Sequence, residues 1–79
     1  SDKLDVQVEE IQIGDSSELA KQQLQSSGIS ALNVIVMAIK RSNGRMEFNP
    51  SRETVIQGGD TLIVMGPEPG LEKLEKKSK

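Results

Sequence analysis

The sequence predicts a small α+β domain, in which a mixed or antiparallel β-sheet packs with two helices in the order β-α-β-β-β-α. Three observations support this: an alternating apolar and polar stretch near the N-terminus, two unbroken apolar runs further along, and an Asn43-Gly44 pair after the first run. Alternation of apolar and polar residues is typical of a half-buried strand, and short unbroken apolar runs are typical of central strands. An Asn-Gly pair is typical of a hairpin turn. Residues 1–79 are expected to form a single domain, because a chain this short does not hold two cores.

The first strand is expected over residues 4–13. Leu4, Val6 and Val8 stand at even positions of the alternating pattern, whereas Ile11 and Ile13 stand at odd positions. Successive side chains of a strand point to opposite faces, so this change of phase predicts one extra residue, a β-bulge, at Glu9-Glu10.

A helix is expected over residues 18–26. Asp15 lies three residues before Glu18, which is the spacing of a capping box. Gly28 would end the helix in the left-handed conformation, and Ile29 would fold back onto its last turn. The inner side of this helix would consist of Leu19, Ala20 and Leu24.

Residues 34–39 are expected to form a central strand covered on both faces, since no polar residue interrupts them. In a two-residue turn at Asn43-Gly44, both residues take positive φ, and Lys40 then lies opposite Glu47. The other face of this hairpin would be shared by Ile39, Met46 and Phe48.

The second half of the chain continues with a strand and a helix. Asn49-Pro50 ends the hairpin, because proline cannot donate a ladder hydrogen bond, and residues 54–56 form a short extended piece. A tight turn at residues 57–60 precedes a buried strand over 61–65. Residues 66–70 break that strand, and residues 71–77 form the second helix, with Leu71 and Leu74 on its inner side.

The composition argues against an enzyme and against a metal site. The chain contains no histidine and no cysteine, so its serines have no imidazole base and a metal would have no thiolate or imidazole ligand. The sequence contains neither a glycine-rich phosphate loop nor a dinucleotide fingerprint. A serine–lysine hydrolase is the one catalytic alternative, and no serine stands in a recognisable motif for it.

Nucleic acid and membrane partners are also disfavoured. Binding of single strands uses stacking aromatic side chains, whereas Phe48 is the only aromatic residue and the net charge is −2. No apolar run approaches the roughly 20 residues of a membrane span, so this segment is not expected to insert into a bilayer.

Basic residues gather in the middle of this acidic chain. Lys40, Arg41, Arg45 and Arg52 lie within thirteen positions that contain a single acid, Glu47. Guanidinium and ammonium groups at a sheet end suit a phosphate-bearing ligand. The alternative is that Lys40 pairs with Glu47 and the other basic side chains are simply solvated.

Self-association is expected on grounds of size. A chain of 79 residues buries only about 60–65% of the surface that its unfolded form exposes, and this one cannot use disulfides to compensate. A second copy, or attachment to a larger protein, is the remaining source of stability.

The ordered set of motifs resembles the C-terminal domain of the TrkA type, the C-terminal lobe of units that regulate potassium conductance (RCK units). One departure is that such domains often carry a glycine near the position of Ala20, where this chain is glutamine-rich. The residues that carry the resemblance are Ala38-Ile39-Lys40-Arg41, Asn43-Gly44, Pro50, Thr54, Gly59-Asp60, Leu62 and Met65-Gly66.

The resemblance implies a cytosolic regulatory and dimerisation domain of a potassium channel or cation transporter, gated by rearrangement of paired C-lobes. It implies a homodimer within a longer protein, joined to a channel or transporter subunit and to a Rossmann-type lobe. That lobe, outside this sequence, would be the one to bind NAD or ATP. Some relatives bind cyclic di-AMP in a groove between two copies, whereas others serve in assembly only, which leaves a purely structural dimerisation domain as the alternative. The candidate ligand-binding residues, from the resemblance and from the basic cluster, are Ile39, Lys40, Arg41, Arg45, Asn49 and Pro50.

Overall fold

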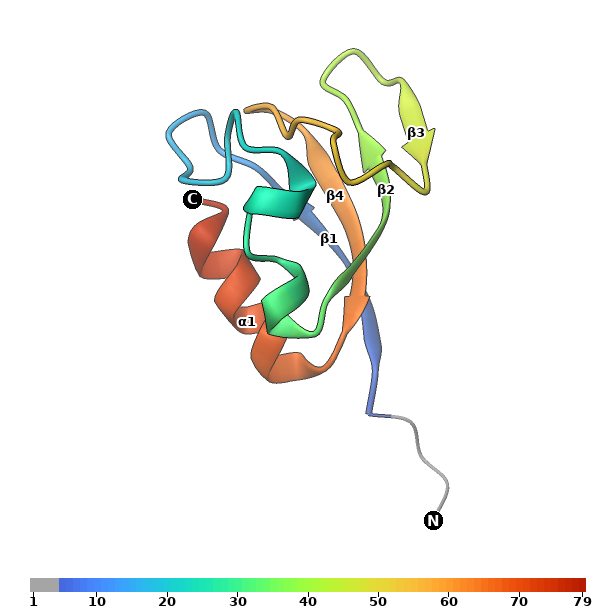
Figure 1. The fold of residues 1–79 in the computed structure, drawn as a ribbon, viewed down its shortest axis with the longest axis vertical. Helices are drawn as coiled ribbons and strands as arrows, with labels where there is room; N and C mark the ends of the chain where they lie inside the picture. The colour runs from blue at the N-terminus through green and yellow to red at the C-terminus, as the bar shows by residue number, and fades with distance from the viewer. Residues whose placement is uncertain (1–4) are drawn as a thin grey trace.

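Four strands form an antiparallel sheet in the order β1-β4-β2-β3 in the computed structural model, which describes residues 5–79 (Figure 1). One α-helix and two short 3-10 helices lie on one side of this sheet. The elements are β1 (Gln7–Gln12), η1 (Leu24–Ser26), η2 (Ser30–Leu32), β2 (Ile35–Lys40), β3 (Met46–Phe48), β4 (Thr61–Gly66) and α1 (Glu68–Lys77). The predicted α+β class is confirmed, with one α-helix in place of two.

The core lies between the sheet and the helical layer. Leu62 and Val64 of β4 face it from the centre of the sheet, and Leu71 and Leu74 of α1 face it from the opposite side. The other residues of the core cluster are Ile11, Ile13, Leu19, Ile29, Val34, Ile39 and Ile56.

The β-bulge lies in β2, not at Glu9-Glu10 as predicted. Strand β1 pairs with β4 without interruption, from Gln7 opposite Gly66 to Gln12 opposite Thr61, whereas the register of β2 shifts between Val36 and Ala38. The phase change in the sequence has another cause: Val8 is 61% exposed on one face of β1, and Ile11 is buried on the other. Leu4, which the prediction placed in this strand, lies outside the described residues.

The predicted helix over residues 18–26 does not form. Lys21 has a φ of 71°, and the backbone around it bonds to a distant segment: Lys21 N donates to Ile56 O (2.7 Å) and Ile56 N to Gln22 O (2.8 Å). Those bonds satisfy groups that a helix would have paired internally. Local capping comes from Ser17 rather than Asp15, because Ser17 Oγ accepts from Leu19 N (3.0 Å).

The hairpin has a longer loop than predicted. Arg41 N donates to Arg45 O (2.8 Å) and Gly44 N to Arg41 O (2.9 Å), with Gly44 at φ 90°, so three residues form the loop. This geometry is the common three-residue hairpin with glycine in the left-handed conformation. The register is therefore one residue off, with Ile39 opposite Glu47 and Lys40 opposite Met46, and every side chain of β3 points to the other face.

Helix α1 begins three residues before its predicted start. Pro69 fits the first turn, where its missing N–H would have no partner, so the two prolines start the helix instead of delaying it. The C-terminal end is held by the turn after β1: Gly14 N donates to Ser78 O (2.7 Å), and Ser17 Oγ donates to Lys77 O (2.5 Å).

Gly70 lets α1 approach η2 closely. A methyl group at this position would overlap the carbonyl oxygen of Leu32, which belongs to the backbone and cannot rotate away. Gly70→Ala is therefore expected to lower the free energy of unfolding by about 1–3 kcal/mol, although alanine is the better helix former. Urea unfolding measures this, with Glu72→Ala on the exposed side of α1 as the control, expected to change it by less than about 0.5 kcal/mol. A stabilising Gly70→Ala would contradict the close approach.

Candidate functional site: the open sheet face and the Arg41 cluster

The face of the sheet that points away from α1 is apolar and uncovered. We call it the open face; its central residues come from all four strands, and its largest exposed side chains are Phe48 (76% exposed), Val8 (61%) and Ile35 (58%). An antiparallel sheet with one solvated face normally carries polar residues there. The register places on the open face Val8, Glu10, Gln12, Ile35, Ala38, Lys40, Met46, Phe48, Thr61, Ile63 and Met65, although Ala38 is covered by its neighbours and only 3% exposed.

Strand β2 explains why the sequence predicted cover on both faces. Its Val36 and Ile39 face the core, but Ile35 points to the open face and is more than half exposed. The prediction is therefore wrong for the chain alone. The apolar run of β2 is typical of a strand that is buried on both faces, yet one face of this sheet is exposed. An exposed apolar patch of this kind is typical of a surface that binds another protein.

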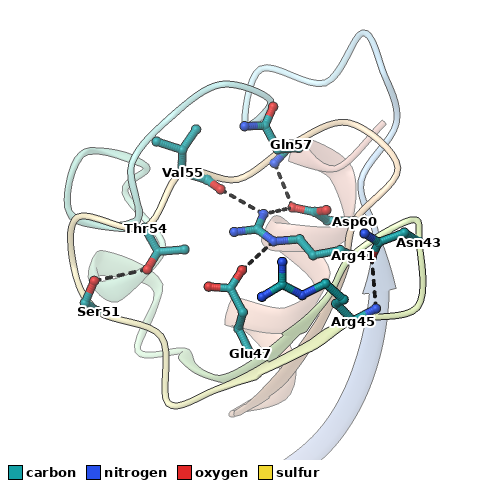
Figure 2. A network of polar contacts seen from close by, with 9 residues as sticks. All are labelled: Arg41, Asn43, Arg45, Glu47, Ser51, Thr54, Val55, Gln57 and Asp60. Atoms are coloured by element: carbon teal, nitrogen blue, oxygen red, sulfur yellow. Dashed lines mark hydrogen bonds and ion pairs between the residues drawn. The ribbon is translucent and has the colours of Figure 1, made fainter.

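Arg41 lies at the centre of a polar cluster that ties the hairpin to the turn before β4 (Figure 2). Its Nε donates to Glu47 Oε2 (2.6 Å), and its Nη1 donates to Asp60 Oδ2 (2.6 Å) and to the carbonyl oxygen of Val55 (2.9 Å). Asp60 Oδ2 also accepts from Gln57 N (2.7 Å). Within residues 5–79 every buried side-chain polar atom has a hydrogen-bond partner.

The two carboxylates hold Arg41 in its charged form. Burial on its own would lower the pKa of Arg41, but its hydrogen bond to Glu47 and the charge of Asp60 outweigh burial and raise that pKa above its ordinary value. The Asp60 side chain is only 2% exposed and that of Arg41 is 21% exposed. The Arg41 side chain is thus bound by internal partners. The sequence analysis had expected it to contact solvent or a ligand.

The other candidate residues are distributed over both sides of the sheet. Ile39 is fully buried in the core and presents no surface to a ligand. Lys40 is exposed on the open face, and Arg45 is exposed at the hairpin loop, where its N–H donates to Asn43 Oδ1 (3.0 Å). Directly after β3 lie the exposed Asn49, at φ 48°, and the half-buried Pro50. The structure therefore does not gather the candidates at one place: Lys40 lies on the open face, Arg45 lies opposite Arg41 at the hairpin loop, and Asn49 N donates to Met37 O (2.8 Å) in the middle of β2. Arg41 points inward.

A groove of about 480 Å³ adjoins the open face at Ile35. It lies between the 3-10 helices and β2, where Leu24, Ile29 and Val36 contribute apolar side chains. Arg52 also lines the groove, and its Nε donates to Gln25 Oε1 (2.9 Å). The groove therefore combines an apolar wall with a guanidinium whose two terminal nitrogens make no hydrogen bond among the described residues.

Sequence reasoning missed Asp60 and the open face. Asp60 was assigned to a tight turn and to the family resemblance but not to an ion pair, and its pairing with Arg41 joins residues 19 positions apart, which no local pattern indicates. The open face could have been found from the change of phase in β1, since Val8 and Ile11 are apolar on opposite sides of one regular strand.

Two further classes of site are not indicated by the described part of the chain. Residues 5–79 contain no group of three or more acidic, histidine or cysteine side chains positioned to hold a metal ion. None of the helices in that range is long and apolar enough to cross a bilayer.

The fold is that of a small α+β lobe, in which a sheet buries one face under its own helix and leaves the other face exposed. The family model of the TrkA-C domain matches residues 8–79, and the chain belongs to that family. The family comprises regulatory domains, not enzymes, and its relatives of known structure include C-terminal domains of RCK units that regulate potassium transport.

Solved structures of such domains superpose on almost the whole chain. The RCK C domain of the potassium transport protein KtrA, in complex with cyclic diadenosine monophosphate, is 25% identical with a TM-score of 0.79, over 90% of this chain and 81% of that one. The RCK_C domain dimer of Streptococcus agalactiae BusR, in complex with cyclic di-AMP, is 19% identical with a TM-score of 0.81, over 92% and 90% of the two chains, and shows the fold alone.

One curated protein of known sequence is also similar. The uncharacterised protein YrvC of Bacillus subtilis (strain 168) is 48% identical over 42 residues, which cover 53% of this chain. The match spans only 26% of that relative, so the relative is several times longer than the part it shares with this chain.

Proposed function

We propose that this chain is a dimerising, ligand-sensing regulatory domain that binds cyclic di-AMP and acts on the cytosolic side within a potassium channel or cation transporter. The open face is the observation that carries the proposal, because an apolar sheet face without cover is suited to a second copy. The likeness to the KtrA domain, whose structure contains cyclic di-AMP, supports the choice of ligand.

In this proposal, basic side chains of the hairpin bind the phosphates of the ligand. Cyclic di-AMP has two phosphates, and two copies related by a twofold axis supply two equivalent sets of cations. Lys40, Arg45 and Arg52 are the exposed members of the predicted cluster, and Asn49 and Pro50 follow directly after β3. Arg41 is already hydrogen-bonded to two carboxylates, so its role here is to fix the hairpin in position.

Regulation follows from the shared interface. A ligand in a groove between two copies contacts both, and it favours whichever arrangement of the pair it binds more tightly. The size of the shift is limited by the difference in affinity between the two arrangements. Attached to a membrane protein, the rearranged pair would change the position of that protein's gating elements.

Cyclic di-AMP is expected to raise the midpoint of thermal unfolding. A ligand at 100 times its dissociation constant stabilises the native state by about 2.7 kcal/mol, which corresponds to roughly 10 °C or more for a domain of this size. Differential scanning fluorimetry measures this, with AMP and cyclic di-GMP as ligand controls. The double variant Lys40→Ala/Arg45→Ala is expected to reduce the shift, whereas Lys73→Ala on α1 is expected to preserve it.

A purely structural dimerisation domain is the second candidate. The open face favours it as well, since an apolar interface needs no ligand to form. No change in the unfolding midpoint with cyclic di-AMP at millimolar concentration, in a protein that sediments as a dimer, would exclude ligand sensing and leave this candidate.

A further inference from the structure

Strand β3 covers only part of the outer edge of β2 (Figure 1). The pairing of the two strands extends from Ala38 to Lys40, and one further bond joins Asn49 N to Met37 O (2.8 Å). Ile35 and Val36 pair with β4 on one side and, in the described part of the chain, with no segment on the other. Successive residues of a strand direct their N–H and C=O groups to opposite edges, so one of these two residues presents an unpaired N–H and C=O outward.

A hollow lies beside this edge because the chain leaves β2 early. After Asn49, which has a φ of 48°, the backbone turns away and bonds to η1 instead: Leu24 N donates to Thr54 O and Gln25 N donates to Arg52 O (2.9 Å each). The groove of about 480 Å³ described above lies between η1 and β2, in the space that a longer β3 would have filled.

The lining of the groove confirms its position at the strand edge. Ile35 points to the open face and Val36 to the core side, yet both line the groove. One hollow contacts side chains on opposite faces of a strand only where it lies beside the strand, and β4 occupies the other edge. An extended peptide in this hollow would bond to the outward N–H and C=O and would continue the sheet past the end of β3.

The chemistry of the groove specifies the peptide. Leu24, Ile29 and Val36 form an apolar wall on the helical side. Arg52 lies on the same side, held to Gln25 of η1, and is the only charged residue that lines the groove. A guanidinium binds a carboxylate through two parallel hydrogen bonds. Residues two apart in an extended peptide share a face, so an apolar and an acidic residue at that spacing would contact the wall and Arg52 together.

The edge strands of the sheet are less suited to a further strand. Strand β1 has Glu9 and Glu10 at its middle, and β3 has Glu47. Charged side chains on an edge strand discourage the addition of another strand. The open part of β2, with Ile35 and Val36, has no charged residue, which makes it the edge most receptive to an added strand.

We propose that the outer edge of β2 at Ile35 and Val36 binds an extended peptide in which an apolar and an acidic residue stand two positions apart, with the acidic side chain paired to Arg52. The peptide adds a short strand to the sheet. Lys40 and Arg45, the hairpin cations of the proposed function, do not line this groove, so either proposal can fail while the other stands.

An NMR titration that follows the backbone amides tests the site, with acetyl-Thr-Val-Thr-Glu-Thr-amide as the probe. The amide signals of Ile35 and Val36 are expected to shift, and the outward amide to exchange more slowly with solvent. Glutamine in place of glutamate in the peptide is expected to weaken binding about three- to tenfold. Arg52→Ala is expected to weaken binding of the acidic peptide equally and to have no effect on the glutamine peptide. Lys73→Ala on α1 is the matched control, expected to leave both affinities unchanged.

N-methylation of the peptide tests the strand pairing itself. The central threonine and the glutamate are adjacent, so their N–H groups point to opposite edges, and methylation of only one of the two is expected to abolish binding. Equal effects of the two methyl groups, or no shift at Ile35 and Val36 at millimolar peptide, overturn the proposal. Hexanoate, which has an apolar chain and a carboxylate but no peptide backbone, is the competing probe. Binding of hexanoate in the groove as tightly as the peptide would assign the groove to small carboxylates and overturn the added strand.

Discussion

Replacing Asp60 by alanine is expected to lower the free energy of unfolding by about 3–5 kcal/mol. The substitution leaves the Arg41 guanidinium without its buried partner, whose side chain is only 2% exposed, and leaves Gln57 N without an acceptor. Breaking a buried ion pair by removing one partner costs this much, because the remaining charge stays partly desolvated. Arg41 keeps 21% of its side-chain surface, which favours the lower end of the range. Urea unfolding at a fixed protein concentration measures the change.

Two companion variants separate charge from hydrogen bonding. Asp60→Asn keeps an acceptor for both N–H groups and is expected to have an intermediate effect. Glu47→Gln alters the other carboxylate that binds Arg41, and the Glu47 side chain is 38% exposed. This substitution is expected to lower the free energy of unfolding by no more than about 1 kcal/mol. Equal effects of Asp60→Ala and Glu47→Gln would show that burial does not set the importance of the two partners.

Replacing Phe48 by glutamate is expected to abolish dimerisation without unfolding the chain. Phe48 is 76% exposed in the single copy, so it contributes little to the stability of the fold by itself. Large aromatic side chains that an interface buries typically contribute about 2–4 kcal/mol to binding, and a carboxylate there would have to be desolvated as well. The dimer dissociation constant is therefore expected to rise by a factor of about 100 or more, measured by sedimentation equilibrium.

Ala31→Glu is the matched control for this variant. Ala31 is exposed on η2, on the helical side of the sheet, and the substitution adds the same charge there. It is expected to leave the dimer intact. A Phe48→Glu protein that remains dimeric with native stability would show that association uses a different surface.

The strands that carry the core could be predicted from the sequence, and so could the turn at residues 57–60. The apolar runs around Ile39 and Leu62 form the two central strands, since buried strands have few alternatives at that length. Gly28 and Gly44 have positive φ, at 83° and 90°, as expected, but Gly28 follows a short 3-10 helix instead of the predicted helix, and Asn43 does not have the positive φ predicted for it.

The elements that were mispredicted depend on contacts between distant segments. The segment around Lys21 has helical composition, but its backbone bonds to residues 52–56, and this tertiary pairing overrides local propensity. The hairpin register depends on whether the loop has two or three residues, a choice that Asn43-Gly44 alone does not determine. The one-residue difference in register also determines the site, because it places Glu47 next to Arg41 and Phe48 on the open face.

The central position of β4 means that the four-stranded sheet cannot be completed until late in synthesis. Strand β4 separates β1 from β2, so β1 has no strand to pair with until residues 61–66 have left the ribosome, whereas β2 can already pair with β3. The end of α1 is then fastened to residues 14–17, almost at the other end of the described chain. Contacts this far apart in sequence carry a large loop-closure cost before any burial offsets it, and they are typical of slow folders. Until then, the apolar strand edges of the nascent chain stay accessible to chaperones and to other chains.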